Sequence, residues 1–278
     1  MRRTHRWILA LASPIVLVVA GAVTLDIWAR SHLAARLPID DLTLADEGPP
    51  GDVEAGRRLY QTVANCQECH GPEGAGSLTI DDGFVGRLVA PDLTGGGHTP
   101  ASFDLAVRHG LDPDGRPLVL MPSDGYAALS DKDLRDLLAY VQSLPPSGRK
   151  LPRSALGIGG RQLVLWGQLH VPAYLIDHDQ VGAPSDASAG EYLARVSGCY
   201  GCHGDDLQGR SLGPTLPPAP PIGGDALDSW SEADFQRALR EGIRPDGRAL
   251  DPTMPWPALS RLDDDEVADL WHAIRNVR

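Results

Sequence analysis

One short pattern, Cys-x-x-Cys-His, occurs twice in this chain of 278 residues, at residues 66–70 and 199–203, and it contains all four cysteines. Cysteines three residues apart lie on one face of a helical turn, so both can form thioethers with one porphyrin, and the histidine that follows can bind its iron. The pattern therefore predicts two covalently bound haem c groups. The attaching and ligating side chains would be Cys66, Cys69 and His70 for the first haem, and Cys199, Cys202 and His203 for the second.

Other uses of paired cysteines fit this spacing less well. A zinc ribbon places its two cysteine pairs about 15–20 residues apart, whereas the two pairs here begin at Cys66 and Cys199, in opposite halves of the chain. A thioredoxin-type redox pair belongs in a βαβ context that this sequence lacks, and two small disulfides would leave both histidines without a role.

The methionines suggest the sixth iron ligand. Apart from the initiator, the chain has only Met121 and Met254, which follow the first cysteine of their motifs at the same distance and are each followed by proline. An isolated methionine in a core is usually a gap filler, but two at matched positions favour a ligand role. We predict that Met121 and Met254 complete His/Met ligation, which raises the haem potential, leaves no open site on the iron and suits electron transfer.

Other histidines could also be ligands, but none recurs in register between the two halves of the chain. We therefore expect surface or structural roles for His98, His109, His170, His178 and His272. The carbonyl groups near Pro91 and Pro214 are expected to accept the second ring N–H of the proximal histidines. Such a contact fixes the orientation of a ligating imidazole.

The two motifs belong to a larger internal repeat, whose features recur at the same offset that separates Cys66 from Cys199. A short helical stretch precedes each motif, and an amphipathic helix closes each unit, with start signals at Ser130 and Asp263. We predict two domains, at residues 51–146 and 186–278. Each has few aromatic residues, and a covalently held haem can serve as most of its core.

The linker between these domains, residues 147–185, is more apolar than a solvated spacer needs to be. Residues 161–175 carry most of its large hydrophobic side chains. Two interpretations stay open: this stretch packs between the two domains, or it forms a patch for a partner subunit.

Residues 1–36 differ in character from the rest of the chain. Three arginines precede residues 7–25, an uncharged run whose length is at the threshold for crossing a bilayer. Arginines before the run place the N-terminus in the cytoplasm and the haem domains on the periplasmic side. We expect the run to be kept as a single-pass anchor in the cytoplasmic membrane, although Ala-Gly-Ala at residues 20–22 also resembles a signal-peptidase site.

The charge distribution limits the possible partners. The net charge is −12, but residues 1–36 carry five arginines against Asp26, a net of +4, so the remainder carries −16. An acidic body repels nucleic-acid phosphates, so we expect no nucleic-acid partner, and it favours a basic docking face on another protein. Alternatively, the charge only keeps the protein soluble.

These features together resemble class I cytochromes c, in particular diheme c-type cytochromes and the cytochrome c subunits of bacterial membrane dehydrogenases and respiratory complexes. The resemblance rests on Gly-x-x-x-Tyr before the first motif, both Cys-x-x-Cys-His motifs, both Met-Pro pairs and Leu-Ser-Asp-Lys-Asp-Leu at residues 129–134. It implies an all-α chain with two tandem cytochrome c domains after an N-terminal transmembrane helix. In each domain the first and last helices would cross near one haem edge.

The function expected from this resemblance is electron transfer between a membrane or periplasmic oxidoreductase and an acceptor such as a terminal oxidase or a soluble carrier. The chain would then be no enzyme and would have no catalytic residue, but it could be the cytochrome subunit of a larger oxidoreductase. The main alternative is a diheme enzyme such as a peroxidase. A peroxidase needs an open iron, against which the two matched methionines weigh. A haem sensor is a third hypothesis, although no output domain is visible.

Overall fold

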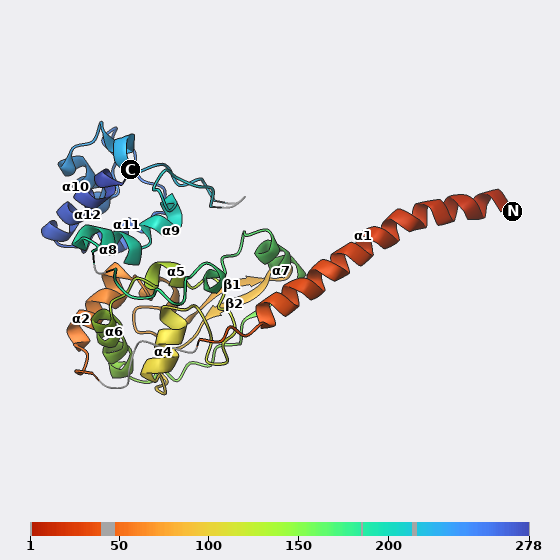
Figure 1. The fold of residues 1–278 in the computed structure, drawn as a ribbon, viewed down its shortest axis with the longest axis horizontal. Coiled ribbons are helices and arrows are strands. Elements are labelled where there is room, and N and C mark those ends of the chain that lie inside the picture. The colour runs from red at the N-terminus through yellow and green to blue at the C-terminus, as the bar shows by residue number, and fades with distance from the viewer. Residues whose placement is uncertain (1, 40–47, 185, 213–215, 278) are drawn as a thin grey trace.

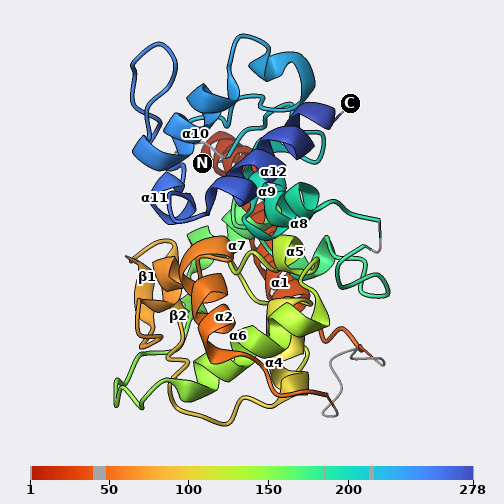
Figure 2. The same ribbon diagram turned by 90° about the vertical axis from the view of Figure 1, so that its left-hand side faces the viewer.

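The computed structural model describes residues 2–39, 48–184, 186–212 and 216–277, with side chains from Val16 onward. A long helix, α1 (Arg2–Ala34), projects from a body of two lobes. Domain 1 forms the lobe that α1 enters, and domain 2 is stacked on it, with α8, α9 and α11 nearest the junction (Figures 1 and 2).

The helix α1 has the length and composition to cross a membrane. Within the described residues, one stretch, Val16–Ala34, meets that condition, and a signal sequence would meet it too. Its apolar side chains are exposed rather than packed on the body, as at Val16 and Val18. The predicted run at residues 7–25 therefore overlaps a helix that presents hydrophobic side chains outward.

Domain 1 is built around the crossing of its first and last helices. The helix α2 (Val53–Arg58) continues into a π-helical turn, η1 (Leu59–Val63), and packs across α6 (Asp131–Ser143). A Cβ atom on Gly56 would lie 1.9 Å from the carbonyl oxygen of Asp136, so only glycine permits this approach. Between these helices lie α3 (Gln67–His70), α4 (Pro100–Val107) and α5 (Ser123–Tyr126).

Domain 2 repeats this arrangement. The helix α8 (Ala189–Val196) packs across α12 (Asp264–Asn276), and a Cβ atom on Gly190 would lie 1.9 Å from the carbonyl oxygen of Asp269. The intervening elements are α9 (Cys199–His203), η3 (Gly224–Leu227), α10 (Glu232–Glu241) and α11 (Trp256–Leu259). The last helix of each domain starts as predicted, since the side chains of Ser130 and Asp263 accept backbone N–H groups three residues ahead.

The all-α prediction is only roughly supported, because domain 1 also contains a small antiparallel sheet in the order β1-β2-β3. The strands are β1 (Ser77–Asp82), β2 (Gly86–Ala90) and β3 (Ala155–Leu156). Asp82 starts the turn of the β1–β2 hairpin by accepting the backbone N–H groups of Phe84 and Val85. The third strand comes from the linker, which therefore extends the fold of domain 1.

The rest of the linker also packs on domain 1 and on α1. The helix α7 (Ile158–Leu165) contacts α1, β2 and β3, and the short helix η2 (Pro172–Tyr174) contacts α5. Leu88, Val164 and Leu169 form a small second core, against which Leu33 of α1 packs. These contacts join the segment to domain 1 and α1, whereas the first of the two interpretations placed it between the domains; the second, a patch for a partner subunit, stays a prediction.

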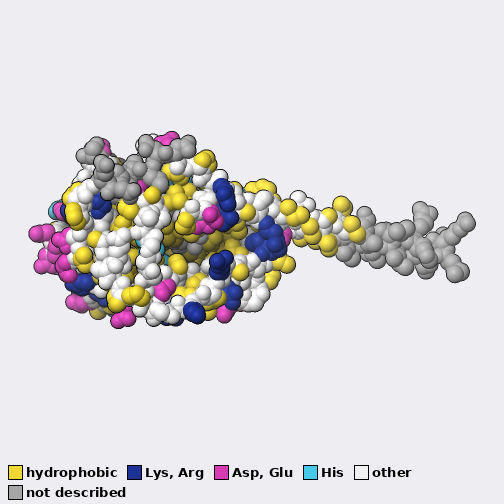
Figure 3. Space-filling model, turned by 90° about the horizontal axis from the view of Figure 1, so that it is seen from below, with side chains coloured by type: hydrophobic (Ala, Val, Ile, Leu, Met, Phe, Trp, Pro, Cys, Tyr) yellow, Lys and Arg dark blue, Asp and Glu magenta, His cyan; other side chains and the backbone are white. Residues whose placement is uncertain are grey.

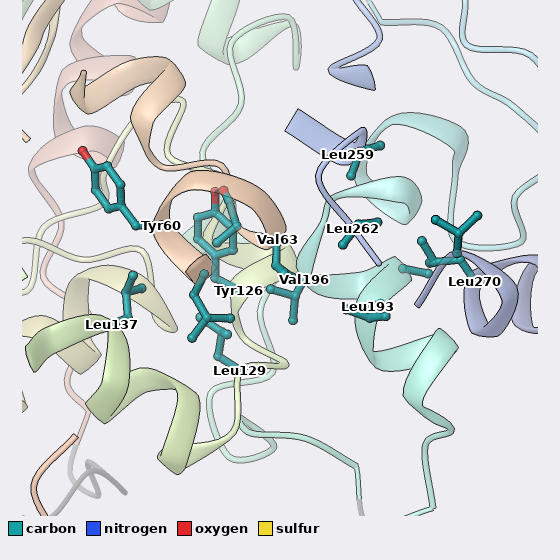
Figure 4. Packing of buried hydrophobic residues seen from close by; sticks show 14 of the residues in the cluster. Tyr60, Val63, Tyr126, Leu129, Leu137, Leu193, Val196, Leu259, Leu262 and Leu270 are labelled. Atoms are coloured by element: carbon teal, nitrogen blue, oxygen red, sulfur yellow. Dashed lines mark hydrogen bonds between the residues drawn. The ribbon is translucent and has the colours of Figure 1, made fainter. Parts of the chain in front are cut away.

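The two domains share one hydrophobic core. Val63 of domain 1 lies beside Val196 of domain 2, with Leu193 and Leu262 continuing the cluster into domain 2 (Figure 4). Two polar contacts also cross the junction: Arg58 pairs with Glu266, and the Tyr192 hydroxyl donates to the Asp133 carboxylate. The shared core and these polar contacts fix the position of each Cys-x-x-Cys-His motif relative to the other domain.

Candidate functional site

Each Cys-x-x-Cys-His motif forms one helical turn with the same entry. The residue before the first cysteine has a left-handed backbone in both copies, with φ of 46° at Asn65 and 81° at Gly198. The backbone N–H of His70 then donates to the carbonyl of Cys66 at 2.9 Å, which closes the turn. The turn brings the two cysteines to the same side of the helix and places the histidine directly after the second cysteine, as thioether attachment and iron ligation require.

Both motif histidines are held through the same ring nitrogen. Nδ1 of His70 lies 3.0 Å from the carbonyl oxygen of Pro91, and Nδ1 of His203 lies 2.7 Å from that of Pro220. A carbonyl oxygen can only accept, so Nδ1 carries the proton and Nε2 keeps its lone pair for a metal. Burial lowers the pKa of both histidines, which favours the neutral imidazole that binds iron.

The predicted carbonyl partners were therefore right in one domain and wrong in the other. Pro91 accepts from His70 as expected. Pro214 itself lies outside the described residues. The carbonyl that accepts from His203 is that of Pro220, not one next to Pro214. The two carbonyls are 21 and 17 residues from their histidines, so the internal repeat does not hold for this contact.

A glycine six residues after each histidine closes the same loop, and this contact was not predicted from the sequence. The N–H groups of Gly76 and Gly209 donate to the carbonyls of His70 and His203 at 2.8 and 2.7 Å. Both glycines have positive φ, and a Cβ atom on either would lie 2.6 Å from a backbone carbonyl oxygen. Their identical distance from the motif was the signal that could have revealed them.

Among the described residues, the cysteines form neither a disulfide nor a zinc site. All four are free, with Cys66 and Cys199 half-buried and Cys69 and Cys202 exposed. Burial raises the pKa of the Cys66 thiol to about 12 and that of Cys199 to about 11, so neither is a thiolate at neutral pH. Within the described part of the chain, no three His, Cys, Asp or Glu side chains converge as a metal site would need.

The two methionines occupy matching positions. Met121 and Met254 are partly buried and pack against the same core as Cys66 and Cys199. In both copies, the carbonyl of the methionine accepts a backbone N–H two residues ahead at 2.8 Å, which starts a short helix. Leu120, just before the first methionine, has a φ of 69°, a strained conformation of the kind that often marks a functional site.

The five other histidines that were weighed as ligands have other partners or an exposed position, in line with the structural roles expected for them. Nε2 of His98 lies 3.2 Å from the carbonyl of Leu93, and His170 pairs with Asp124. His109 is fully buried, and its Nδ1 lies 3.0 Å from Nδ1 of His178. His272 is exposed on α12.

The donor set in each domain fits a covalently held haem. Each domain combines an imidazole held through Nδ1, two thiols on one turn and a methionine thioether at the same core. Figure 3 shows a hollow lined by hydrophobic side chains on the lower face of the body. A haem is a large apolar macrocycle and needs hydrophobic surroundings of this kind. Each domain has few aromatic residues that could form its core without the haem.

Comparison with known proteins agrees with this geometry. The family model for cytochrome c oxidase, cbb3-type, subunit III matches residues 51–141, and that for cytochrome c matches residues 187–278. A protein named diheme cytochrome c-type, from Cereibacter sphaeroides, is 29% identical over 82% of this chain and 86% of its own length.

Two further relatives are subunits of dehydrogenases. The fructose dehydrogenase cytochrome subunit of Gluconobacter japonicus is 28% identical over 77% of this chain and 50% of its own length. The cytochrome c subunit of the alcohol dehydrogenase (quinone) of Gluconobacter oxydans is 36% identical over 30% of this chain and 19% of its own length. This chain thus spans half or less of the dehydrogenase subunits that it matches.

The chain is therefore built of two cytochrome c domains, one in each half, which supports a diheme c-type cytochrome. Two cytochrome c domains imply haem c as the cofactor. The relatives named as dehydrogenase cytochrome subunits support the predicted role in electron transfer.

Proposed function

We propose that this chain is a membrane-anchored diheme cytochrome c that carries electrons through two covalently bound haems in sequence. In each domain both motif cysteines would attach the porphyrin, the motif histidine would bind the iron through Nε2, and the methionine would bind it from the other side. The observation that carries this assignment is the repeated geometry of His70 on Pro91 and His203 on Pro220, each on a Cys-x-x-Cys-His turn. The bound haem would supply a one-electron redox couple, and the protein would set its potential through the axial ligands.

The junction between the domains supports transfer from one haem to the other. The helix α5, which follows Met121, contacts α9, which carries Cys202 and His203. Reciprocally, α11, which follows Met254, contacts η1, which leads into Cys66. The methionine side of each domain therefore lies against the cysteine side of the other, so the two haem sites would face a common junction.

The electron donor would be a dehydrogenase or another membrane or periplasmic oxidoreductase, and the acceptor a terminal oxidase or a soluble carrier. The relatives named as cytochrome subunits of fructose and alcohol dehydrogenases support this class of donor. The acidic charge of the body favours partners with basic docking faces, which would also speed their association at low salt.

The proposed location is the cytoplasmic membrane, with α1 as a retained single-pass anchor and both domains on the periplasmic side. The exposed apolar side chains of α1 support the anchor. The arginines at the start of the chain support the orientation. Cell fractionation tests it. Release of the protein by osmotic shock, with its N-terminal residues removed, would contradict the anchor.

The ligand assignment is tested by the redox potentials of Met121→Leu and Met254→Leu. Because a thioether ligand raises the haem potential, each substitution should lower the potential of one haem and remove its sulfur-to-iron charge-transfer band. Leu93→Ala is the control, since Leu93 packs half-buried against the same core and is not a proposed ligand. Unchanged potentials and bands in both methionine variants would refute the assignment.

A further inference from the structure

Large apolar side chains remain exposed on the part of domain 1 that lies beside α1. Trp28 of α1 is 53% exposed, Phe84 at the tip of the β1–β2 hairpin 68%, and Ile158 and Trp166 at the two ends of α7 62% and 67%. We refer to these four residues as the juxtamembrane collar. Scattered exposed apolar residues are normal on a soluble protein, but a group of this size on neighbouring elements marks an interaction surface.

Contacts between the elements join the hairpin tip to α7. The backbone N–H of Gly159 donates to the carbonyl of Phe84 at 3.1 Å, and a Cβ atom on Gly159 would lie 2.2 Å from the Phe84 ring. The hairpin tip therefore sits on the first turn of α7. Ile158 begins α7 and Trp166 follows its last residue, so the two exposed side chains mark its ends, about 12 Å apart along the helix axis.

An ion pair fixes the collar at one level along α1. The Arg161 side chain of α7 donates to the Asp26 carboxylate at 2.6 Å, and both side chains are largely buried. Trp28 lies half a turn beyond Asp26 and stacks on His32, which stacks on Tyr174 of η2. The docking of α7 against α1 thus holds the collar beside Asp26.

Asp26 is also where the apolar run of α1 ends. Residues 7–25 carry no charge, and as a helix of 1.5 Å rise per residue they would span about 28 Å, close to the thickness of the hydrocarbon core. We take residues 7–25 as the span, because the overlapping stretch Val16–Ala34 would place Asp26 and Arg30 inside the bilayer. Asp26 would then lie at the membrane–water boundary, where tryptophan side chains are favoured. Lys and Arg side chains gather on the body near α1, whereas acidic side chains gather mainly at the far end (Figure 3). A basic surface near the bilayer is attracted to anionic headgroups.

We infer that the juxtamembrane collar rests in the lipid headgroup layer, so that domain 1 is held against the membrane in one orientation rather than tethered at a distance. This inference rests on the proposed function, because it requires that α1 stay in the membrane. The surface next to the membrane would be domain 1, and domain 2 would be free to meet a partner.

Photo-cross-linking to lipid tests this inference. The full-length holoprotein would be reconstituted in vesicles of phosphatidylethanolamine and phosphatidylglycerol that contain a phospholipid with a photoreactive group at the top of its acyl chain. Peptide mass spectrometry should then find lipid adducts on α1, on the hairpin tip and on α7. It should find none around Leu216, which is also an exposed apolar residue but lies in domain 2.

A triple variant, Phe84→Ser, Ile158→Ser and Trp166→Ser, should lose the adducts on the hairpin and on α7 and keep those on α1. Its haem spectrum should be unchanged, because all three side chains are exposed. Leu216→Ser is the matched control and should keep the wild-type pattern of adducts.

Other outcomes would overturn the inference. Adducts on α1 without adducts on the wild-type hairpin and α7 would show an anchored protein whose body stands off the bilayer. If those segments instead cross-link to a protein subunit in native membranes, the collar is a subunit interface. A protein that washes off the vesicles without any adduct would contradict the anchor itself, and with it the collar.

Discussion

Replacement of Gly56 by alanine should weaken domain 1 at the crossing of α2 and α6. The new Cβ atom would lie 1.9 Å from the carbonyl oxygen of Asp136 and 2.9 Å from the Cβ of Tyr140, whereas ordinary contact begins at 3.4 Å. The two helices must therefore move apart locally until the new methyl group fits. Asp52 resists this movement, because its backbone N–H donates to the Asp136 carboxylate at 2.7 Å.

The magnitude follows from two opposing effects. Overpacking of this kind destabilises a protein by about 1–3 kcal/mol, and alanine regains about 0.5–1 kcal/mol through its higher helix propensity. Because the obstacle is backbone rather than a flexible side chain, we expect the upper part of the range and a net loss of about 1–2 kcal/mol. This corresponds to a change of about 5- to 30-fold in the unfolding equilibrium constant.

The assay is equilibrium denaturant unfolding of the holoprotein, followed by helical circular dichroism and by haem absorbance. Gly95→Ala in the same domain is the control, because its Cβ atom would have no neighbour within 4 Å and its backbone needs no positive φ. Gly190→Ala should reproduce the loss in domain 2. A Gly56→Ala protein as stable as the wild type would refute the account of the crossing.

Two further substitutions probe the linker contact and the domain junction. Burial lowers the pKa of His109, so the stability that the neutral imidazole contributes is present above the unfolded-state pKa, about 6.5, and is lost as the pH falls below it. The free energy of unfolding of the wild type should therefore fall between about pH 7 and 5, and it should fall less in His109→Gln. Identical pH profiles for the two proteins would contradict this. Tyr192→Phe removes a hydroxyl that donates to Asp133 and accepts from the backbone of Ser130. It should lower the free energy of unfolding by about 1–2 kcal/mol, and the two domains should then unfold in separate transitions. A single transition at the wild-type midpoint would show that this contact contributes nothing.

Local patterns in the sequence predicted much of the site. The motif located His70 and His203, whose role as ligands stays a prediction, and the carbonyl of Pro91 was confirmed as the partner of His70. The carbonyl that holds His203 could not be predicted by analogy, because the loop after the second motif is shorter and brings Pro220 to the ring. A repeat retains the chemistry of a contact, but loop length decides which residue makes it.

The features that the sequence did not predict depend on long-range packing. The sheet of domain 1 takes its third strand from the linker, where Ala155 pairs with Arg87 from a distant part of the chain. The glycine at each helix crossing lay within the helical stretch that was identified, but its close approach to Asp136 or Asp269 is visible only when both helices are in place. The apolar linker indicated packing, and only the structure shows that it packs on α1.

The most direct test of the central claim is the intact mass of the full-length protein, matured with the haem-attachment machinery and then unfolded in acid and organic solvent. Haem that is not covalently bound is lost under these conditions. The account predicts a mass that includes two haem groups, and a Cys66→Ser, Cys69→Ser variant that retains one. A wild-type mass equal to that of the bare polypeptide, or one that includes a single haem, would contradict it.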